Sequence, residues 1–178
     1  MKIVKSLILV LALSLTANMA AQSEKDKKVM ADAVKAKEAL LEAQSGLQKF
    51  FDNSAGYVIF PNVGKGGFII GGASGNGVVY EGNQVVGMAG LKKLNVGLQA
   101  GGQAIIEVIF FETHVDLNRF KEGKFQFAAE TSAVALKSGI AFNAKYKEGV
   151  AVFALPKAGL MADASVGGQK FSYKPIIM

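Results

Sequence analysis

The feature that most constrains the fold is a series of short apolar runs, separated by glycine, that begins at Tyr57 and continues towards the C-terminus. These runs are rich in Val, Ile and Phe, the residues that favour extended strands. Glycine inside or between strands marks turns, bulges or close approaches of the backbone. We therefore expect an α+β, mainly β protein, in which one leading helix packs on an antiparallel sheet folded as a sandwich or partly open barrel.

Ten runs are candidate strands, namely Gly56–Pro61, Gly66–Gly72, Gly75–Glu81, Gln84–Ala89, Val96–Gln103, Glu107–Glu112, Phe125–Ala135, Gly139–Lys147, Val150–Leu155 and Gly159–Gly167. Hairpin signals stand at residues 81–83, 147–149 and 156–158. One short helix interrupts the strands. Thr113 with Asp116 predicts its N-cap, and Leu117 with Phe120 predicts its apolar face.

Residues 23–51 have the pattern of a single amphipathic helix. Ser23 and Asp26 have capping-box spacing, and an apolar stripe follows at Val29, Ala33, Ala36, Leu40, Ala43, Leu47 and Phe50. Several alanines in the stripe favour a close approach to a flat sheet. A short coiled coil would bury little, and a helix lying on a membrane would need a more basic polar face. We expect the stripe to join the core.

The first 21 residues resemble a secretory signal peptide, with Lys2 and Lys5 before an apolar run and small residues after it. The expected mature chain, residues 22–178, suits one domain with a leading helix at 22–52 and a β-rich body at 55–175. We expect an exported protein, periplasmic or extracellular. The chain has no cysteine, so disulfides and thiolate metal sites are excluded. Cleavage would reduce the formal net charge from +6 to +4.

The stretch from Val63 to Gly77 is glycine-rich and contains Lys65, but it matches no nucleotide-binding motif. A phosphate-binding loop needs Gly-Lys followed by Ser or Thr, and Gly66 follows Lys65 instead. The dinucleotide pattern would need a third glycine where Ile69 stands. Both motifs lead into a helix, whereas this stretch leads into further strand. We expect it to form turns of the sheet.

Catalytic chemistry has little support in the residue pattern. His114 is the only histidine, and acidic residues do not cluster at metal-ligand spacing. A Ser-His-Asp triad remains open in principle, but no Gly-x-Ser-x-Gly segment favours one. We expect a non-catalytic protein without metal or cofactor.

Two kinds of charged residue are candidates for function. Glu107 lies inside an apolar run, so its carboxyl group needs a partner or stays protonated; a structural pairing is the plainer interpretation. The basic residues fall mostly at predicted turns and strand ends. The candidates for a basic rim are Lys65, Lys92, Lys93, Arg119, Lys121, Lys124, Lys145 and Lys147, with Lys170 and Lys174 in similar positions. Lysines scattered around the fold are the alternative.

Four segments together resemble the SYLF domain, also called the actin- and lipid-binding domain. They are "AGYVIFPNVGKGGFIIGGASGNGVVY", "VGLQAGGQAIIEVIFFE", "LNRFKEGKFQFAAETSAVAL" and "VAVFALPKAGLMADASVGG", in the family's order. Leu155-Pro156 departs from the family's usual last turn. The resemblance implies a module that binds anionic lipid headgroups. Actin binding, known for some eukaryotic members, does not carry over to an exported chain.

Anionic phospholipid or a membrane surface is therefore the expected partner. An envelope protein bound through the helix stripe or a sheet edge is the alternative. Nucleic acid is not expected, because the net charge is small and Arg119 is the only arginine. An outer-membrane barrel is a further alternative, disfavoured by the absence of tryptophan and by short, glycine-broken strands.

Overall fold

The computed structural model describes residues 24–64, 73–93, 104–125, 127, 134–135, 145–157 and 168–176. The expected signal peptide, the Ser23 cap and Lys65 lie outside these ranges. So do the predicted strands at 66–72, 96–103 and 159–167, most of those at 125–135 and 139–147, and part of the turn at 156–158.

One sheet organises the described residues. Its strands are β1 (Gly56–Val63), β2 (Ala73–Glu81), β3 (Gln84–Lys93), β4 (Ile105–Phe111), β5 (Val134–Ala135), β6 (Val150–Pro156) and β7 (Gln169–Pro175). Their order is β5-β6-β4-β1-β2-β3-β7, and every pairing except the short parallel one between β5 and β6 is antiparallel. Within the described ranges the sheet does not close into a barrel. Seven strands with a few helices confirm the expected mainly β, α+β architecture.

Two tight turns fix the register of neighbouring strands. Gly82 and Asn83 join β2 to β3 with φ of 55° and 65°, and Glu148 and Gly149 precede β6 with φ of 51° and 78°. Positive φ at both central residues is the type I′ geometry, which matches the twist of antiparallel strands. The hairpin signals at 81–83 and 147–149 are thereby confirmed, and the third, at 156–158, lies partly outside the described residues.

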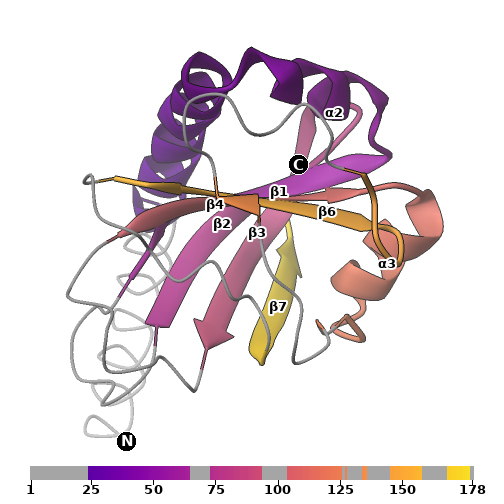
Figure 1. Cartoon of the computed structure of the whole chain (residues 1–178). Coiled ribbons are helices and arrows are strands. Elements are labelled where there is room, and N and C mark those ends of the chain that lie inside the picture. The colour runs from indigo at the N-terminus through magenta and orange to yellow at the C-terminus, as the bar shows by residue number, and fades with distance from the viewer. Residues whose placement is uncertain are drawn as a thin grey trace, which may run out of the picture.

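A helical layer covers one face of the sheet. It consists of a leading helix (residues 24–43), a 3-10 turn (Ser45–Leu47) and α2 (Gln48–Asn53), which Figure 1 shows above the strands. Leu40 and Leu47 are fully buried, and the Phe50 ring lies edge-on to Phe153 of β6 at 5.1 Å. The apolar stripe is therefore part of the core, as predicted. The buried stripe residues offer little surface to a protein partner, so a sheet edge is the more accessible surface for that alternative.

The opposite face of the sheet is covered by α3 (His114–Lys121) and by aromatic residues that follow it. The Phe120 ring packs on Phe111 of β4 at 5.1 Å and on Phe171 of β7 at 5.3 Å. Phe171 also lies 6.0 Å from Phe60 of β1, although two strands separate β1 from β7. The sheet must curl to bring these rings together, which extends the normal right-handed twist.

Two predictions about these elements were wrong. The leading helix is not continuous, because Gln44 adopts an extended conformation (φ −156°, ψ 96°) before the 3-10 turn. A straight helix over 23–51 would be about 43 Å long, whereas β2 spans only about 30 Å. The break occurs next to Ser45 and Gly46, which are weaker helix formers than alanine. It allows Phe50 and Phe51 of α2 to pack on the sheet.

The second error concerns β7, which was not among the candidate strands. Residues 169–174 alternate strictly between inward and outward positions, because Gln169, Phe171 and Tyr173 face the core side. The run is poor in Val and Ile, so a search for apolar runs passes over it. The period of two was the signal that could have found it. β4 and β6 lie within two residues of their predictions, whereas β3 extends to Lys93.

Candidate anion-binding surface

The predicted basic residues lie at two opposite ends of the sheet. Arg119 and Lys121 belong to α3, Lys124 follows it, and Lys145 and Lys147 precede β6, all near the β2–β3 turn end of the strands. Lys92 and Lys93 end β3 at the other end, about 25 Å away along β2. Lys65 and the Lys93 side chain lie outside the description. The structure thus divides the candidates into two groups.

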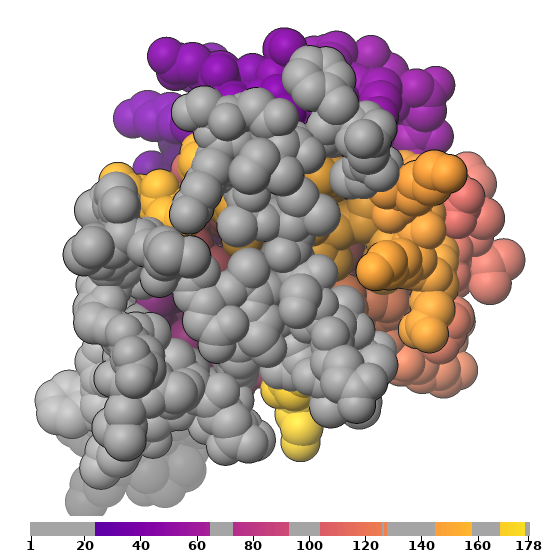
Figure 2. Space-filling view, in the orientation of Figure 1, coloured from indigo at the N-terminus to yellow at the C-terminus, as the bar shows by residue number. Residues whose placement is uncertain are grey.

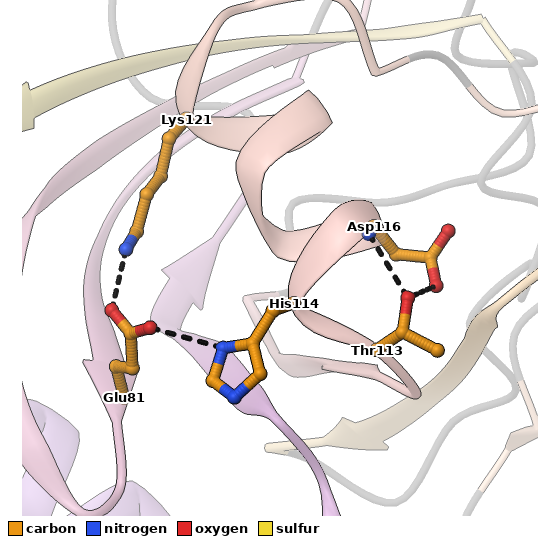
Figure 3. A network of polar contacts seen from close by, with 5 residues as sticks. All are labelled: Glu81, Thr113, His114, Asp116 and Lys121. Carbon is orange, nitrogen blue, oxygen red and sulfur yellow. Dashed lines mark hydrogen bonds and ion pairs between the residues drawn. The ribbon is translucent and has the colours of Figure 1, made fainter.

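Within the α3 group, two lysines already have acidic partners. Lys121 Nζ lies 2.6 Å from Glu81 Oε2, and the other oxygen of Glu81 lies 3.2 Å from His114 Nδ1 (Figure 3). The hydrogen bond from Lys121 lowers the pKa of Glu81 below its ordinary value. Lys124 pairs with Glu122 at 2.7 Å. These contacts neutralise much of the positive charge at this end and hold α3 to β2.

The start of α3 confirms the predicted N-cap. The Thr113 hydroxyl accepts a hydrogen bond from the Asp116 backbone N–H at 3.3 Å and donates to the Asp116 carboxylate at 2.6 Å, as Figure 3 shows. The Asp116 carboxylate also stands at the position that a side chain on Gly149 would fill. The cap therefore fixes α3 against the turn before β6.

The opposite end of the sheet holds a different arrangement, which we call the lysine face: Lys92 on β3 with Lys170 and Lys174 on β7. Lys92 is directly opposite Lys170 in the antiparallel register, and Lys174 is opposite Met88. Directly opposite residues project from the same face, and positions two apart repeat it. The three exposed lysines therefore share one side of the sheet. In the part of the chain described here, none of them has an acidic partner.

Small and uncharged residues lie between these lysines. Gly90 is opposite Ser172, and a Cβ on Gly90 would stand 2.6 Å from the Ser172 hydroxyl oxygen. Ser74 and Asn76 of β2 extend the same side, opposite Lys92 and Gly90. The surface between the three cations is therefore low and polar. Such a surface lets an anionic group approach several ammonium groups at once.

The pairing of Lys92 with Lys170 works against stability. Like charges directly opposite on a sheet repel, by an amount on the order of 0.5 kcal/mol in water. No carboxylate among the described residues of β2, β3 or β7 on this side relieves the repulsion. A bound anion would relieve it. Residue pattern alone did not predict this apposition, since Lys92 and Lys170 are far apart in the sequence.

Glu107 lies in the core between the sheet and the α3 layer. It is fully buried, and the buried Gln169 of β7 donates a hydrogen bond from Nε2 to Glu107 Oε2 at 3.0 Å. Gln169 is the first residue of β7, and this hydrogen bond connects β7 to β4. The Glu107 side chain is fully buried and hydrogen-bonded, which favours the structural interpretation.

A second polar contact fastens the leading helix to the β2–β3 turn. Lys37 Nζ donates to the Tyr57 hydroxyl at 3.1 Å and lies 4.5 Å from the centre of the Phe51 ring. The Tyr57 hydroxyl donates to Asn83 Oδ1 at 2.9 Å. Burial lowers the pKa of Lys37 and raises the pKa of Tyr57 well above its usual range. Because the pKa of Tyr57 is raised and that of Lys37 is lowered, the tyrosine hydroxyl keeps its proton and remains a donor to Asn83.

The described residues contain no group of three or more His, Asp and Glu side chains placed to hold a metal ion. None of the described helices has both the length and the apolar character that crossing a membrane requires.

Comparison with protein-family models finds no match. Among curated proteins, the chain is similar to "Beta cell expansion factor A" of Aeromonas veronii, with 29% identity over 135 residues. The aligned region covers 74% of this chain and 51% of the relative, so the chain spans about half the length of the protein it matches. This distant likeness is consistent with the SYLF resemblance and with a non-enzymatic binding role. It does not by itself assign a family.

Proposed function

We propose that this protein is an exported, SYLF-like module that binds anionic lipid headgroups peripherally and without catalysis. The observation that carries the proposal is the lysine face, where Lys92 and Lys170 are held opposite each other and Lys174 lies on the same side. Lys174 lies four residues along β7 from Lys170, about 13 Å away. Three cations on one side of the sheet, without an acidic partner among the described residues, favour an anionic ligand. Resemblance to a lipid-binding family supports the same chemistry.

The expected affinity is modest. Each basic residue at an anionic membrane surface contributes about 1 kcal/mol, so the three lysines contribute about 3 kcal/mol. Attachment of this strength is reversible and weakens as salt shortens the range of the interaction. The surface around Gly90 and Ser172 suits a headgroup layer, because the small side chains there let several headgroups approach the three lysines.

The substitution Lys92→Glu tests this proposal, because it should raise fold stability and lower vesicle binding at the same time. It places a carboxylate opposite Lys170, which replaces a cross-strand repulsion with an attraction and should raise fold stability by up to about 1 kcal/mol. The same change reduces the charge of the lysine face by two units. Binding to anionic vesicles should then fall about 30-fold, since about 2 kcal/mol is lost.

The assay is co-sedimentation of residues 22–178 with zwitterionic and anionic vesicles over a salt series. Lys147→Glu is the matched control, because it makes the same change in net charge at the opposite end of the sheet. The control should bind nearly as tightly as the unaltered chain. Equal losses in the two variants would show that overall charge, and not the lysine face, governs binding. Unchanged binding by Lys92→Glu would refute the proposal.

A further inference from the structure

A groove separates the leading helix from the ends of β4 and β6. It has a volume of about 430 Å³ and is lined by Asp32, Lys35, Ala36, Ala39, Ile106, Leu155, Pro156 and Lys157. Figure 2 shows the orange atoms of β6 and its neighbours directly beneath the indigo atoms of the leading helix. The groove lies near β6, towards one edge of the sheet, whereas the lysine face lies on β3 and β7 at the other edge. The two are therefore separate features.

The groove exists because small side chains stand where larger ones would fill the space. Ile106 and Leu155 are directly opposite in the β4–β6 register and form an apolar floor. Above them the leading helix presents Ala36 and Ala39. Ala36 lies about one helical turn before the buried Leu40, and Ala39 immediately precedes it. Leucine at either alanine position would add three carbon atoms over this floor. Ile106 is nearly covered, at 5% exposure, whereas Leu155 and Ala39 remain partly exposed and form the open part of the groove.

The rim of the groove carries three charges. Lys35 and Lys157 are exposed cations, and Asp32 is a half-buried acid, so the rim has one excess positive charge. Lys157 is held in place by two contacts. Its backbone N–H donates to the Ala104 carbonyl at 3.1 Å, and its ammonium group donates to the Asn62 side-chain oxygen. An occupant with a single negative charge would leave the rim neutral.

We infer that this groove binds a single-chain anionic amphiphile, a fatty acid carboxylate, with its hydrocarbon chain along Ile106 and Leu155 and its head at Lys35 and Lys157. The volume lies in the range of sites for small organic ligands, and the apolar floor with a few polar groups at one rim is typical of them. An uncharged hydrocarbon would leave the two ammonium groups unused. This binding does not depend on the lysine face.

Calorimetric titration with monomeric decanoate tests the inference. Affinity should rise by up to about fourfold per methylene from octanoate to dodecanoate, as expected for burial of each group. Decanol, which has the chain without the charge, should bind about fivefold more weakly. Ala39→Leu should abolish decanoate binding by filling the groove. Lys35→Gln combined with Lys157→Gln should bring decanoate to the affinity of decanol, whereas Lys147→Gln should change nothing.

The competing outcomes are distinct. Absence of decanoate binding, unaltered binding by Ala39→Leu, or equal binding of decanol and decanoate would each overturn the inference. Circular dichroism with urea unfolding provides the fold control for Ala39→Leu, which leaves the lysine face intact and should unfold as cooperatively as the unaltered chain. The lysine pair lies at the surface, so the double Gln variant decides the matter if Ala39→Leu does not fold. Conversely, Lys92→Glu should bind decanoate normally.

Discussion

The hydrogen bond between Gln169 and Glu107 offers a stringent test of how β7 is held to the sheet. Gln169 Nε2 lies 3.0 Å from Glu107 Oε2, and both side chains are buried. Hydrogen bonds contribute from about 0.5 kcal/mol between neutral groups to about 3 kcal/mol where one group is charged, and more of the energy is expressed where water is absent. We therefore expect the two side chains to be coupled by about 2 kcal/mol.

A single substitution would not measure this coupling. Gln169→Leu removes the donor, but it also removes the Gln169 Oε1 atom, which is buried and has no hydrogen-bond partner among the described residues. The first change costs about 2 kcal/mol and the second relieves about 1 kcal/mol or more, so the net effect is small. Glu107→Leu likewise removes every other interaction of that carboxyl group. The stability change of each single variant therefore combines the Gln169–Glu107 interaction with effects unrelated to it.

A double-mutant cycle cancels those unrelated terms. Urea unfolding followed by circular dichroism would be measured for the unaltered chain, Gln169→Leu, Glu107→Leu and the double variant at neutral pH. We expect the double variant to be about 2 kcal/mol more stable than the sum of the single effects predicts. A coupling energy near zero would refute the reasoning, because it would mean that the contact contributes nothing beyond packing. Val86→Ala with Glu107→Leu, a pair not joined by a hydrogen bond, serves as the additive reference.

Two further predictions concern the pH dependence of stability and the packing of β2. Glu81→Gln should lower stability by about 0.5 kcal/mol at neutral pH, a value kept small because the pair is partly exposed. Since Lys121 lowers the pKa of Glu81, this contribution is complete above pH 4.5 and disappears as the pH falls through the lowered value, so urea midpoints of the two chains should converge in acid. A difference that persists in acid would contradict the pairing. Gly77→Ala should destabilise the fold by about 1–3 kcal/mol, because the new Cβ would stand 2.6 Å from the Phe60 ring and 2.7 Å from the Ile59 carbonyl oxygen. Thermal unfolding would check this against Ser74→Ala, and equal midpoints would show that β1 moves aside at no cost.

Residue pattern predicted most of the described sheet, because local signals sufficed there. Turn residues with positive φ at 82–83 and 148–149 and apolar runs in β1, β4 and β6 required no knowledge of distant contacts. The break at Gln44 was not predictable from spacing, since apolar residues continue at Leu47 and Phe50 as if the helix were straight. It arises from a mismatch between helix length and sheet size, which is a property of the assembled fold.

The candidate site was harder to predict, for a related reason. Lys92 was recognised as a strand-end cation, but its partner Lys170 lies on a strand that the apolar search missed. The two lysines form one charged surface only because the β3–β7 register places them side by side. The ion pairs of Lys121 and Lys124 show the converse, because lysines that looked equivalent in the sequence have acidic partners in the fold. Sequence spacing does not distinguish a neutralised lysine from an unneutralised one.

The burial of the central strands also sets where such a protein can change over evolution. β1 and β4 are enclosed by the helical layer on one side and the aromatic layer on the other, so nearly every position in them is buried. A substitution there alters two packed layers at once, and selection removes it whatever the ligand. The outer ends of β2, β3 and β7 carry no such penalty on their exposed side. Relatives should therefore keep the two central strands nearly fixed while the chemistry of β3 and β7 diverges, which makes those two strands the place to look for differences in what each relative recognises.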